Sequence, residues 1–129
     1  AAALGIAAKL AADHHDARVA ACNNFKHQLM SALSPLNPII YGDPIHTLPN
    51  VVNLSFGNID SEAVMIAVKD VVSISNGSAC TASTYTPSHV LTAMGLSPGQ
   101  IAAATRWSWC HTTPDVNWFD LVKKIRALA

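Results

Sequence analysis

The residues best suited to nucleophilic chemistry in this sequence are its three cysteines, and Cys80 is the one in the most open setting. It lies within SNGSACTAS, a run of small and polar side chains that predicts a loop over residues 75–86. A structural cysteine usually packs inside a helix or strand, whereas a thiol that transfers a group needs an uncrowded, movable segment. From these residues alone, an ordinary loop cysteine is favoured over a reactive one. No Lys, Arg or His lies within five residues of Cys80, so any group that lowers its thiol pKa must come from elsewhere in the fold.

Arg106 is the second residue that could do chemistry. A guanidinium offers two parallel N–H donors to the two oxygens of a carboxylate. If residues 105–110 form a strand, Arg106, Ser108 and Cys110 share one face of it. Trp107 and Trp109 then share the other face and pack into a core, which leaves Arg106 accessible. A surface arginine in an ion pair is the alternative, and the residues alone favour it.

Neither a metal site nor a disulfide framework is predicted. An odd number of widely spaced cysteines argues against a disulfide framework, and the absence of a C-x-x-C pair argues against a zinc ribbon. The six histidines are scattered, and none has a ligand spacing with a cysteine. They are His14, His15, His27, His46, His89 and His111. Cysteine usage of this kind is typical of the reducing cytoplasm.

The composition fits one domain with no net charge. The sequence has 129 residues, of which half are apolar and 12% are charged, with a formal net charge of zero. Nothing in this composition indicates electrostatic binding of nucleic acid or of an anionic membrane. No apolar run reaches the roughly 18 residues needed to cross a bilayer. The first residues are helix-like without a capping residue, which indicates a fragment of a longer protein.

Helical and strand patterns alternate along the sequence, which predicts an α/β or α+β layer with helices packed on one sheet. Residues 2–33 form one long helix or two helices broken near residues 13–16, with a buried stripe at Cys22, Phe25, Leu29 and Leu33. The strand candidates are residues 39–41, 51–56, 71–74 and 105–110. In the strand at 51–56, Val52, Leu54 and Phe56 share one face, and Val51, Asn53 and Ser55 share the other.

Further helices are expected after Asp60, after Thr86-Pro87, after Ser97-Pro98 and after Thr113-Pro114. At the third of these, Ser97 and Gln100 have the spacing of a capping box.

Several blocks of the sequence resemble the motifs of the cysteine desulfurases. They are GSACTAS at 77–83, TPSHVLTAMGLS at 86–97 and ATRWS at 104–108. Upstream, LPNVVNLSF at 48–56 resembles the family's L-P-N-x-x-N-x-S-F strand, and residues 62–70 resemble the helix that follows it. The resemblance covers residues 40–110, and residues 1–39 match in character only.

This resemblance implies a fold and a reaction. The fold is the small C-terminal domain of a pyridoxal-phosphate enzyme of fold type I, with helices packed on a small, mainly antiparallel sheet. Residues 1–33 would link to a large domain outside this chain, and residues 34–129 would form the small domain. In the family, the loop cysteine takes sulfur from L-cysteine and leaves alanine, while the arginine holds the substrate α-carboxylate. Carried over, Cys80 is the nucleophile and Arg106 is the clamp.

The resemblance also implies what surrounds this chain. Full-length members are cytoplasmic homodimers that pass persulfide sulfur to an acceptor protein, for example in iron–sulfur assembly. Their cofactor lysine lies in an S-x-H-K segment of the large domain, which this sequence does not contain. We therefore expect pyridoxal 5'-phosphate in the full-length enzyme but not on this chain, which alone should be inactive.

Three departures from the family pattern bear on the subfamily. Asn76 stands where Ser is usual, Trp107 replaces Phe, and Trp109-Cys110-His111 replaces L-G-R. These variants resemble the desulfurases that serve DNA phosphorothioation in bacteria, which would supply sulfur to a partner protein without touching DNA. Two alternatives stay open: a module that docks an acceptor protein, and a redox sensor in which Cys110 resolves an oxidised Cys80.

Overall fold

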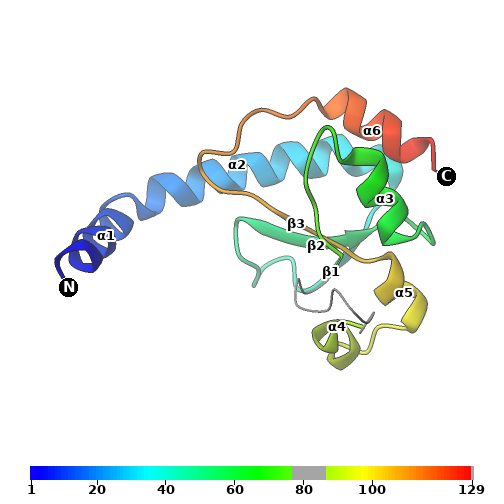
Figure 1. The fold of residues 1–129 in the computed structure, drawn as a ribbon, viewed down its shortest axis with the longest axis horizontal. Coiled ribbons are helices and arrows are strands. Elements are labelled where there is room, and N and C mark those ends of the chain that lie inside the picture. Colours follow the sequence, from blue (N-terminus) through cyan, green and yellow to red (C-terminus); the bar gives the residue numbers. More distant parts are fainter. Residues whose placement is uncertain (77–86, 129) are drawn as a thin grey trace.

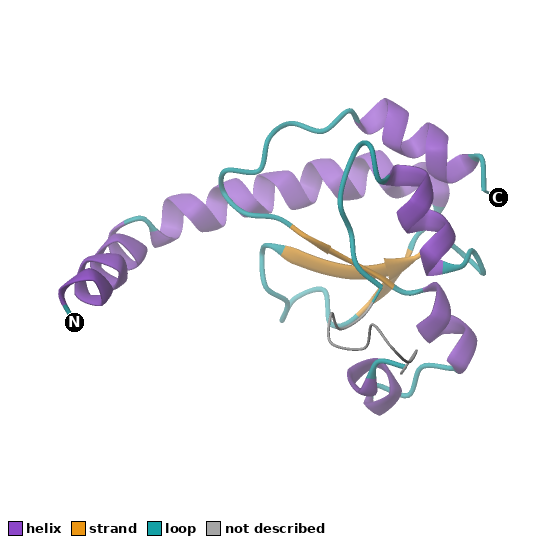
Figure 2. Ribbon diagram, in the orientation of Figure 1, coloured by secondary structure: helices purple, strands orange, loops and turns teal. Residues whose placement is uncertain are grey.

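The computed structural model describes residues 1–76 and 87–128, and within them it shows an α+β arrangement (Figures 1 and 2). Cys80 and the rest of the segment 77–86 lie outside the described residues. In chain order the elements are α1 (Ala2–Asp13), α2 (His15–Leu33), a 3₁₀ turn (Ser34–Leu36), β1 (Ile39–Tyr41), β2 (Val51–Ser55), α3 (Ser61–Val68), α4 (His89–Ala93), α5 (Pro98–Ala103), β3 (Thr105–Ser108) and α6 (Trp118–Arg126).

The sheet has three antiparallel strands in the order β1-β2-β3, so β2 is central. Tyr41 of β1 and Arg106 of β3 both pair with Asn53 of β2. The expectation of a small, mainly antiparallel sheet is confirmed. β3 ends at Ser108, two residues earlier than expected, although the N–H of Trp109 still donates to the carbonyl of Asn50 at 3.1 Å.

The predicted strand at residues 71–74 is wrong. The N–H groups of Val71 and Val72 both donate to the carbonyl of Val68, at 2.8 and 2.9 Å, so the chain continues the last turn of α3. Only Ser75 reaches the sheet, as an isolated antiparallel bridge to Arg106. The β-branched run is therefore used for packing, because Val71, Val72 and Ile74 lie against the main core.

The long N-terminal helical pattern divides at His14, whose φ of −110° and ψ of 6° depart from helical values. The predicted break near residues 13–16 is confirmed. α2 buries Cys22, Leu29 and Leu33, three positions of the expected stripe, and Phe25 is half-buried. α1 buries no residue and extends away from the sheet in Figure 1.

The main core lies on one face of the sheet. Val52, Leu54 and Phe56 alternate toward this face, as the sequence predicts, and meet Trp107 from β3. They are covered by α2, α3 and α6. On the opposite side lie α4 and α5, which build a smaller cluster of Leu91, Ile101 and Ala104 with Tyr41 and Leu96 (Figure 1).

Local capping explains where the shorter helices begin. The expected capping box at Ser97 and Gln100 is present, with Pro98 in the first turn of α5. Two helices start later than predicted. Ser88, not Thr86, caps α4, and α6 begins at Trp118 with Asn117 as its cap.

Leu54 offers a direct test of the core. It is fully buried in the central strand, so Leu54→Ala should lower the free energy of unfolding by about 2–5 kcal/mol, because the change leaves a cavity. The measurement is the urea midpoint at constant m-value. Ile66→Ala is the control, since Ile66 is 66% exposed on α3 and its loss should change stability by less than about 0.5 kcal/mol. Equal effects of the two changes would contradict this packing.

Candidate functional site

Arg106 lies on β3 with its side chain exposed, on the face opposite the buried Trp107. The alternation predicted for this strand is confirmed, with Thr105 and Trp107 buried and Arg106 and Ser108 exposed. None of the described carboxylates forms an ion pair with Arg106. The alternative of an ion-paired surface arginine therefore finds no partner in the described part of the chain.

The backbone of Arg106 is hydrogen-bonded to Ser75, which precedes the segment that contains Cys80. Its N–H donates to the carbonyl of Ser75 at 2.6 Å, and its carbonyl accepts from the N–H of Ser75 at 3.1 Å. Ser75 precedes Cys80 by five residues in the sequence. Cys80 itself is outside the described residues, so its predicted role stays a prediction.

Two buried hydrogen bonds fix the core side of β3. The hydroxyl of Thr105 donates to the carbonyl of Leu54 at 2.9 Å and accepts from the indole N–H of Trp107, also at 2.9 Å. Beyond the strand, the indole N–H of Trp109 donates to the carbonyl of Cys22 in α2 at 2.9 Å. These bonds hold the backbone of β3 against β2 and α2, so the direction in which Arg106 leaves the sheet is set by the core.

A groove of about 380 Å³ opens beside Arg106. Its walls are mainly apolar and come from β1, β2, α2 and the turn at residues 44–48. The lining residues are Lys26, Met30, Ile40, Tyr41, Pro44, Thr47, Leu48, Val51, Val52, Asn53 and Arg106. The two charged residues of this lining are both cations, and the groove therefore suits an anionic group attached to an apolar body.

Asn53 is a residue of this groove for which the sequence analysis predicts no role. It pairs with Arg106 across the sheet. Its amide oxygen Oδ1 is buried and has no hydrogen-bond partner among the described residues. The alternation along β2 places Asn53 on the face away from the core. A polar carboxamide in the middle of a strand is the sequence feature from which a role at the site could have been suspected.

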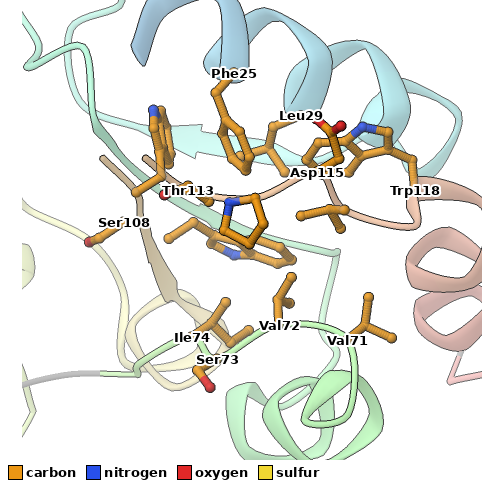
Figure 3. Close-up of a pocket in the computed structure, with 14 residues that line it drawn as sticks. Phe25, Leu29, Val71, Val72, Ser73, Ile74, Ser108, Thr113, Asp115 and Trp118 are labelled. Atoms are coloured by element: carbon orange, nitrogen blue, oxygen red, sulfur yellow. The ribbon is translucent and has the colours of Figure 1, made fainter. Parts of the chain in front are cut away.

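A second cavity, of about 230 Å³, lies between α2, residues 71–74 and residues 107–118 (Figure 3). Its walls include Phe25, Leu29, Trp107, Trp109 and Trp118. The ring centroid of Phe25 lies 5.4 Å from the ring centroid of Trp109 and 5.4 Å from that of Trp118. This cavity does not include Arg106. Its lining is mainly apolar but also contains Ser73, Ser108, Thr113 and Asp115.

The two described cysteines differ in exposure. Cys22 is buried in α2, whereas Cys110 is exposed after β3. The Sγ of Cys110 lies 3.2 Å from the hydroxyl oxygen of Thr112 and accepts from the hydroxyl of Thr113 at 3.7 Å. Hydrogen bonds from Thr112, and then from Thr113, lower the pKa of the Cys110 thiol because they stabilise the thiolate. Because Cys80 lies outside the described residues, the distance between Cys110 and Cys80 is not defined, and the resolving role of Cys110 stays a prediction.

The described residues contain no cluster of three or more His, Cys, Asp and Glu side chains that could hold a metal ion. Among those same residues, no helix is both long and apolar enough to span a membrane.

Comparison with known proteins relates this chain to one group of enzymes. No family model matches the sequence. The "Cysteine desulfurase" of Trichormus azollae is 32% identical over 136 residues, covering 98% of this chain and 34% of that protein. "Cysteine desulfurase IscS" of Salmonella typhi is 29% identical over 125 residues, covering 94% of this chain and 31% of that protein. The chain thus spans about a third of the length of these relatives.

Solved structures agree with the sequence comparison. A NifS-like protein from Rickettsia africae superposes with a TM-score of 0.70 at 21% identity, over 96% of this chain and 32% of that chain, and shows the shared fold. DndA from Streptomyces lividans superposes with a TM-score of 0.62 at 32% identity, over 83% of this chain and 30% of that chain.

The hydroxyl of Thr105 provides a test of how β3 is held. Thr105→Val keeps the shape but removes both bonds and leaves the buried Trp107 N–H without an acceptor, so the free energy of unfolding should fall by about 1–3 kcal/mol. Thr105→Ser keeps the hydroxyl and should cost less than the valine. Chemical denaturation monitored by tryptophan fluorescence measures both. A valine variant as stable as the original protein would show that these bonds do not secure the strand.

The lowered pKa of Cys110 predicts the pH dependence of its alkylation. Since the thiolate is the reactive form, the alkylation of Cys110 by iodoacetamide should reach half of its maximal rate at a lower pH than the alkylation of an unperturbed thiol. Thr112→Val should move that midpoint to higher pH, and Thr112→Ser should restore it. The rates are read by mass spectrometry of the Cys110 peptide. An unchanged midpoint in Thr112→Val would contradict the assigned cause.

Proposed function

We propose that this chain, which is homologous to about a third of the length of the cysteine desulfurases, carries the sulfur-accepting thiol and the carboxylate clamp of such an enzyme. The observation that carries the proposal is the placement of Arg106. It stands exposed beside an apolar groove, and the chain that leads to Cys80 is bonded to its backbone.

The clamp follows from the charge of the groove. A zwitterionic amino acid such as L-cysteine presents a carboxylate with two oxygens, and the guanidinium of Arg106 can donate to both. Because no described carboxylate pairs with Arg106, its donors are not already occupied by an ion pair within the described chain. The apolar walls lower the local dielectric constant and thereby strengthen the attraction between the guanidinium and the carboxylate.

The nucleophile is Cys80, and its distance from the clamp is limited by covalent geometry. Five residues of extended chain reach at most about 18 Å, and the count starts at Ser75, which is bonded to Arg106. In the reaction, the Cys80 thiolate attacks the sulfur of the bound L-cysteine. An S–S bond forms and the substrate's C–S bond breaks. The electron pair of that bond stays on the substrate carbon, which takes up one proton and becomes the methyl group of alanine. Pyridoxal phosphate, held by residues outside this chain, would stabilise the negative charge that develops there.

The cofactor of the full-length enzyme, pyridoxal phosphate, does not fit the lysines of this chain. A Schiff-base lysine is usually desolvated in a pocket, and none of the five lysines is buried. Lys9 pairs with Asp13, Lys124 pairs with Asp70, and Lys26 donates to the hydroxyl of Thr47. We therefore propose that residues outside this chain hold the cofactor and that the chain alone is inactive.

Helix α1 supports the proposal that this chain works as part of a larger protein. Leu4, Ile6 and Leu10 are 75%, 62% and 46% exposed, and α1 buries nothing. Three large apolar side chains left exposed on a helix that buries nothing are consistent with a helix that another part of the protein covers. We propose that α1 and α2 link the small domain to a cofactor-binding domain, and that the whole enzyme is a cytoplasmic homodimer.

The sulfur acceptor is proposed to be a protein. The 32% identity with DndA supports a subfamily close to that protein, as do the Trp107 and Trp109-Cys110-His111 variants. The formal net charge of this chain is zero, so the chain as a whole has no electrostatic attraction to the DNA backbone. If the pathway serves DNA phosphorothioation, the persulfide would pass to a partner protein that acts on the DNA.

A thiol redox sensor is the second candidate, and the exposed Cys110 with its lowered pKa is the observation that favours it. The sensor requires a disulfide between Cys80 and Cys110 under mild oxidation. The desulfurase requires a persulfide on Cys80 and no role for Cys110. Mass spectrometry of the oxidised and cysteine-treated proteins distinguishes the two.

The desulfurase proposal predicts the effect of Cys80→Ser in the full-length, cofactor-loaded protein. Alanine and sulfide release from L-cysteine should fall by at least about 10³-fold, because the serine oxygen cannot accept the sulfur. Cys110→Ser is the matched control and should keep normal turnover. Normal turnover by Cys80→Ser would refute the proposal, and a loss of turnover in Cys110→Ser alone would point to the wrong cysteine.

A further inference from the structure

The amide oxygen of Asn53 is an unusual feature of the groove wall. Its Oδ1 is inaccessible to solvent and accepts no hydrogen bond among the described residues. Buried polar groups in native proteins are nearly always paired, because water solvates an exposed carbonyl oxygen well and an apolar interior does not. A buried acceptor at the edge of a groove therefore indicates a partner that is bound only in another state of the site.

The sheet register places one donor closest to Asn53. Asn53 and Arg106 are directly opposite each other in β2 and β3. Both backbone hydrogen bonds of Arg106 go to Ser75, on the far edge of β3. The Asn53–Arg106 pair is therefore a non-hydrogen-bonded pair of the β2–β3 ladder, the type in which opposite side chains on the same face come closest.

The other polar side chains of the groove already have partners. Lys26 donates to the hydroxyl of Thr47 at 2.9 Å, and the hydroxyl of Tyr41 is bonded to that of Ser55 at 2.8 Å. A guanidinium has five N–H donors, and a bidentate carboxylate uses two of them. Arg106 can therefore bind a carboxylate and still donate to a second acceptor.

We infer that Asn53 is the positioning residue of the carboxylate clamp: its Oδ1 accepts one N–H of the Arg106 guanidinium and so orients the remaining N–H pair toward the substrate carboxylate. This inference rests on the proposed function and adds to it a residue that acts through Arg106. An exposed arginine samples many rotamers, and ordering it on binding costs entropy. A fixed acceptor beside the guanidinium restricts the Arg106 side chain to fewer rotamers before the substrate binds, so less entropy is lost when the carboxylate binds.

The inference makes a specific kinetic prediction. The α-carboxylate is held equally in the bound substrate and in the transition state, because the bonds that change are at the sulfur. Loss of the orienting hydrogen bond should therefore raise KM for L-cysteine by about 10-fold while kcat changes by less than about 2-fold. A residue needed only for the stability of the sheet would lower the melting temperature and leave KM unchanged.

The chain offers a matched pair of substitutions at this position. Asn53→Val and Asn53→Thr have the same shape, and both are β-branched and suit a strand. Only the threonine keeps an oxygen that can accept from the guanidinium. KM should rise about 10-fold in Asn53→Val and by less than about 3-fold in Asn53→Thr. Ile39→Thr, a half-exposed position of β1 outside the groove lining, is the control for a change in the same sheet.

A double-mutant cycle with Arg106→Ala in the full-length, cofactor-loaded enzyme decides whether Asn53 acts through Arg106. If it does, adding Asn53→Val to Arg106→Ala should raise KM no further. The same rise in KM in both backgrounds, or no rise in either, overturns the role of Asn53. The proposed function has a separate outcome: if Arg106→Ala alone leaves KM unchanged, the clamp itself is wrong.

Asn53→Asp keeps the inference testable if the valine variant fails to fold. Its carboxylate is close in size to the carboxamide and would pair with the guanidinium, thereby competing with the substrate carboxylate. KM should then rise more than 10-fold, with kcat again nearly unchanged. A normal KM in Asn53→Asp, with Arg106→Ala impaired, overturns the positioning role and leaves the clamp in place.

Discussion

The pairing of β2 with β3 is the interaction on which the rest of this structure depends. It joins residues 51–54 to residues 105–108, which are about fifty positions apart in the sequence. On the core face it is secured by the hydroxyl of Thr105, which bridges the carbonyl of Leu54 and the indole of Trp107. On the other face the same pairing brings Asn53 opposite Arg106. Because side chains alternate along a strand, a slip of one residue would bury the arginine and expose the tryptophan.

Much of this arrangement is predictable where the signal is local. The alternation of Arg106 and Trp107, the break at His14 and the capping box at Ser97 each depend on a few neighbouring residues, and each is confirmed. The start of α6 is not predictable in this way. The hydroxyl of Thr113 accepts from the N–H of Cys110 at 2.8 Å and so closes the preceding turn, and Asn117 caps the helix instead. A threonine can cap in either direction, and its sequence neighbourhood does not reveal which one.

The remaining errors and omissions have a tertiary cause. Val71, Val72 and Ile74 have the composition of a strand, but their side chains pack on the main core while the chain is still completing the last turn of α3. β-propensity reflects a fit to a half-buried surface, and a core-packed turn provides the same environment as a sheet. The proximity of Asn53 to Arg106 is likewise invisible in the sequence, because the register between two distant strands is set by the whole core. The family resemblance identified the arginine through its motif, whereas the asparagine emerged only from the pairing.

The bridge between Ser75 and Arg106 gives the proposed chemistry a structural basis. A thiol and a carboxylate clamp could lie on parts of an enzyme that have no bonded connection. Here the backbone of Arg106 in β3 is bonded to Ser75, five residues before Cys80, by two hydrogen bonds. Any displacement of β3 therefore carries Ser75 with it. If Cys80 is the nucleophile and Arg106 holds the substrate carboxylate, the same strand fixes both the position of that carboxylate and the point from which the chain leads to Cys80.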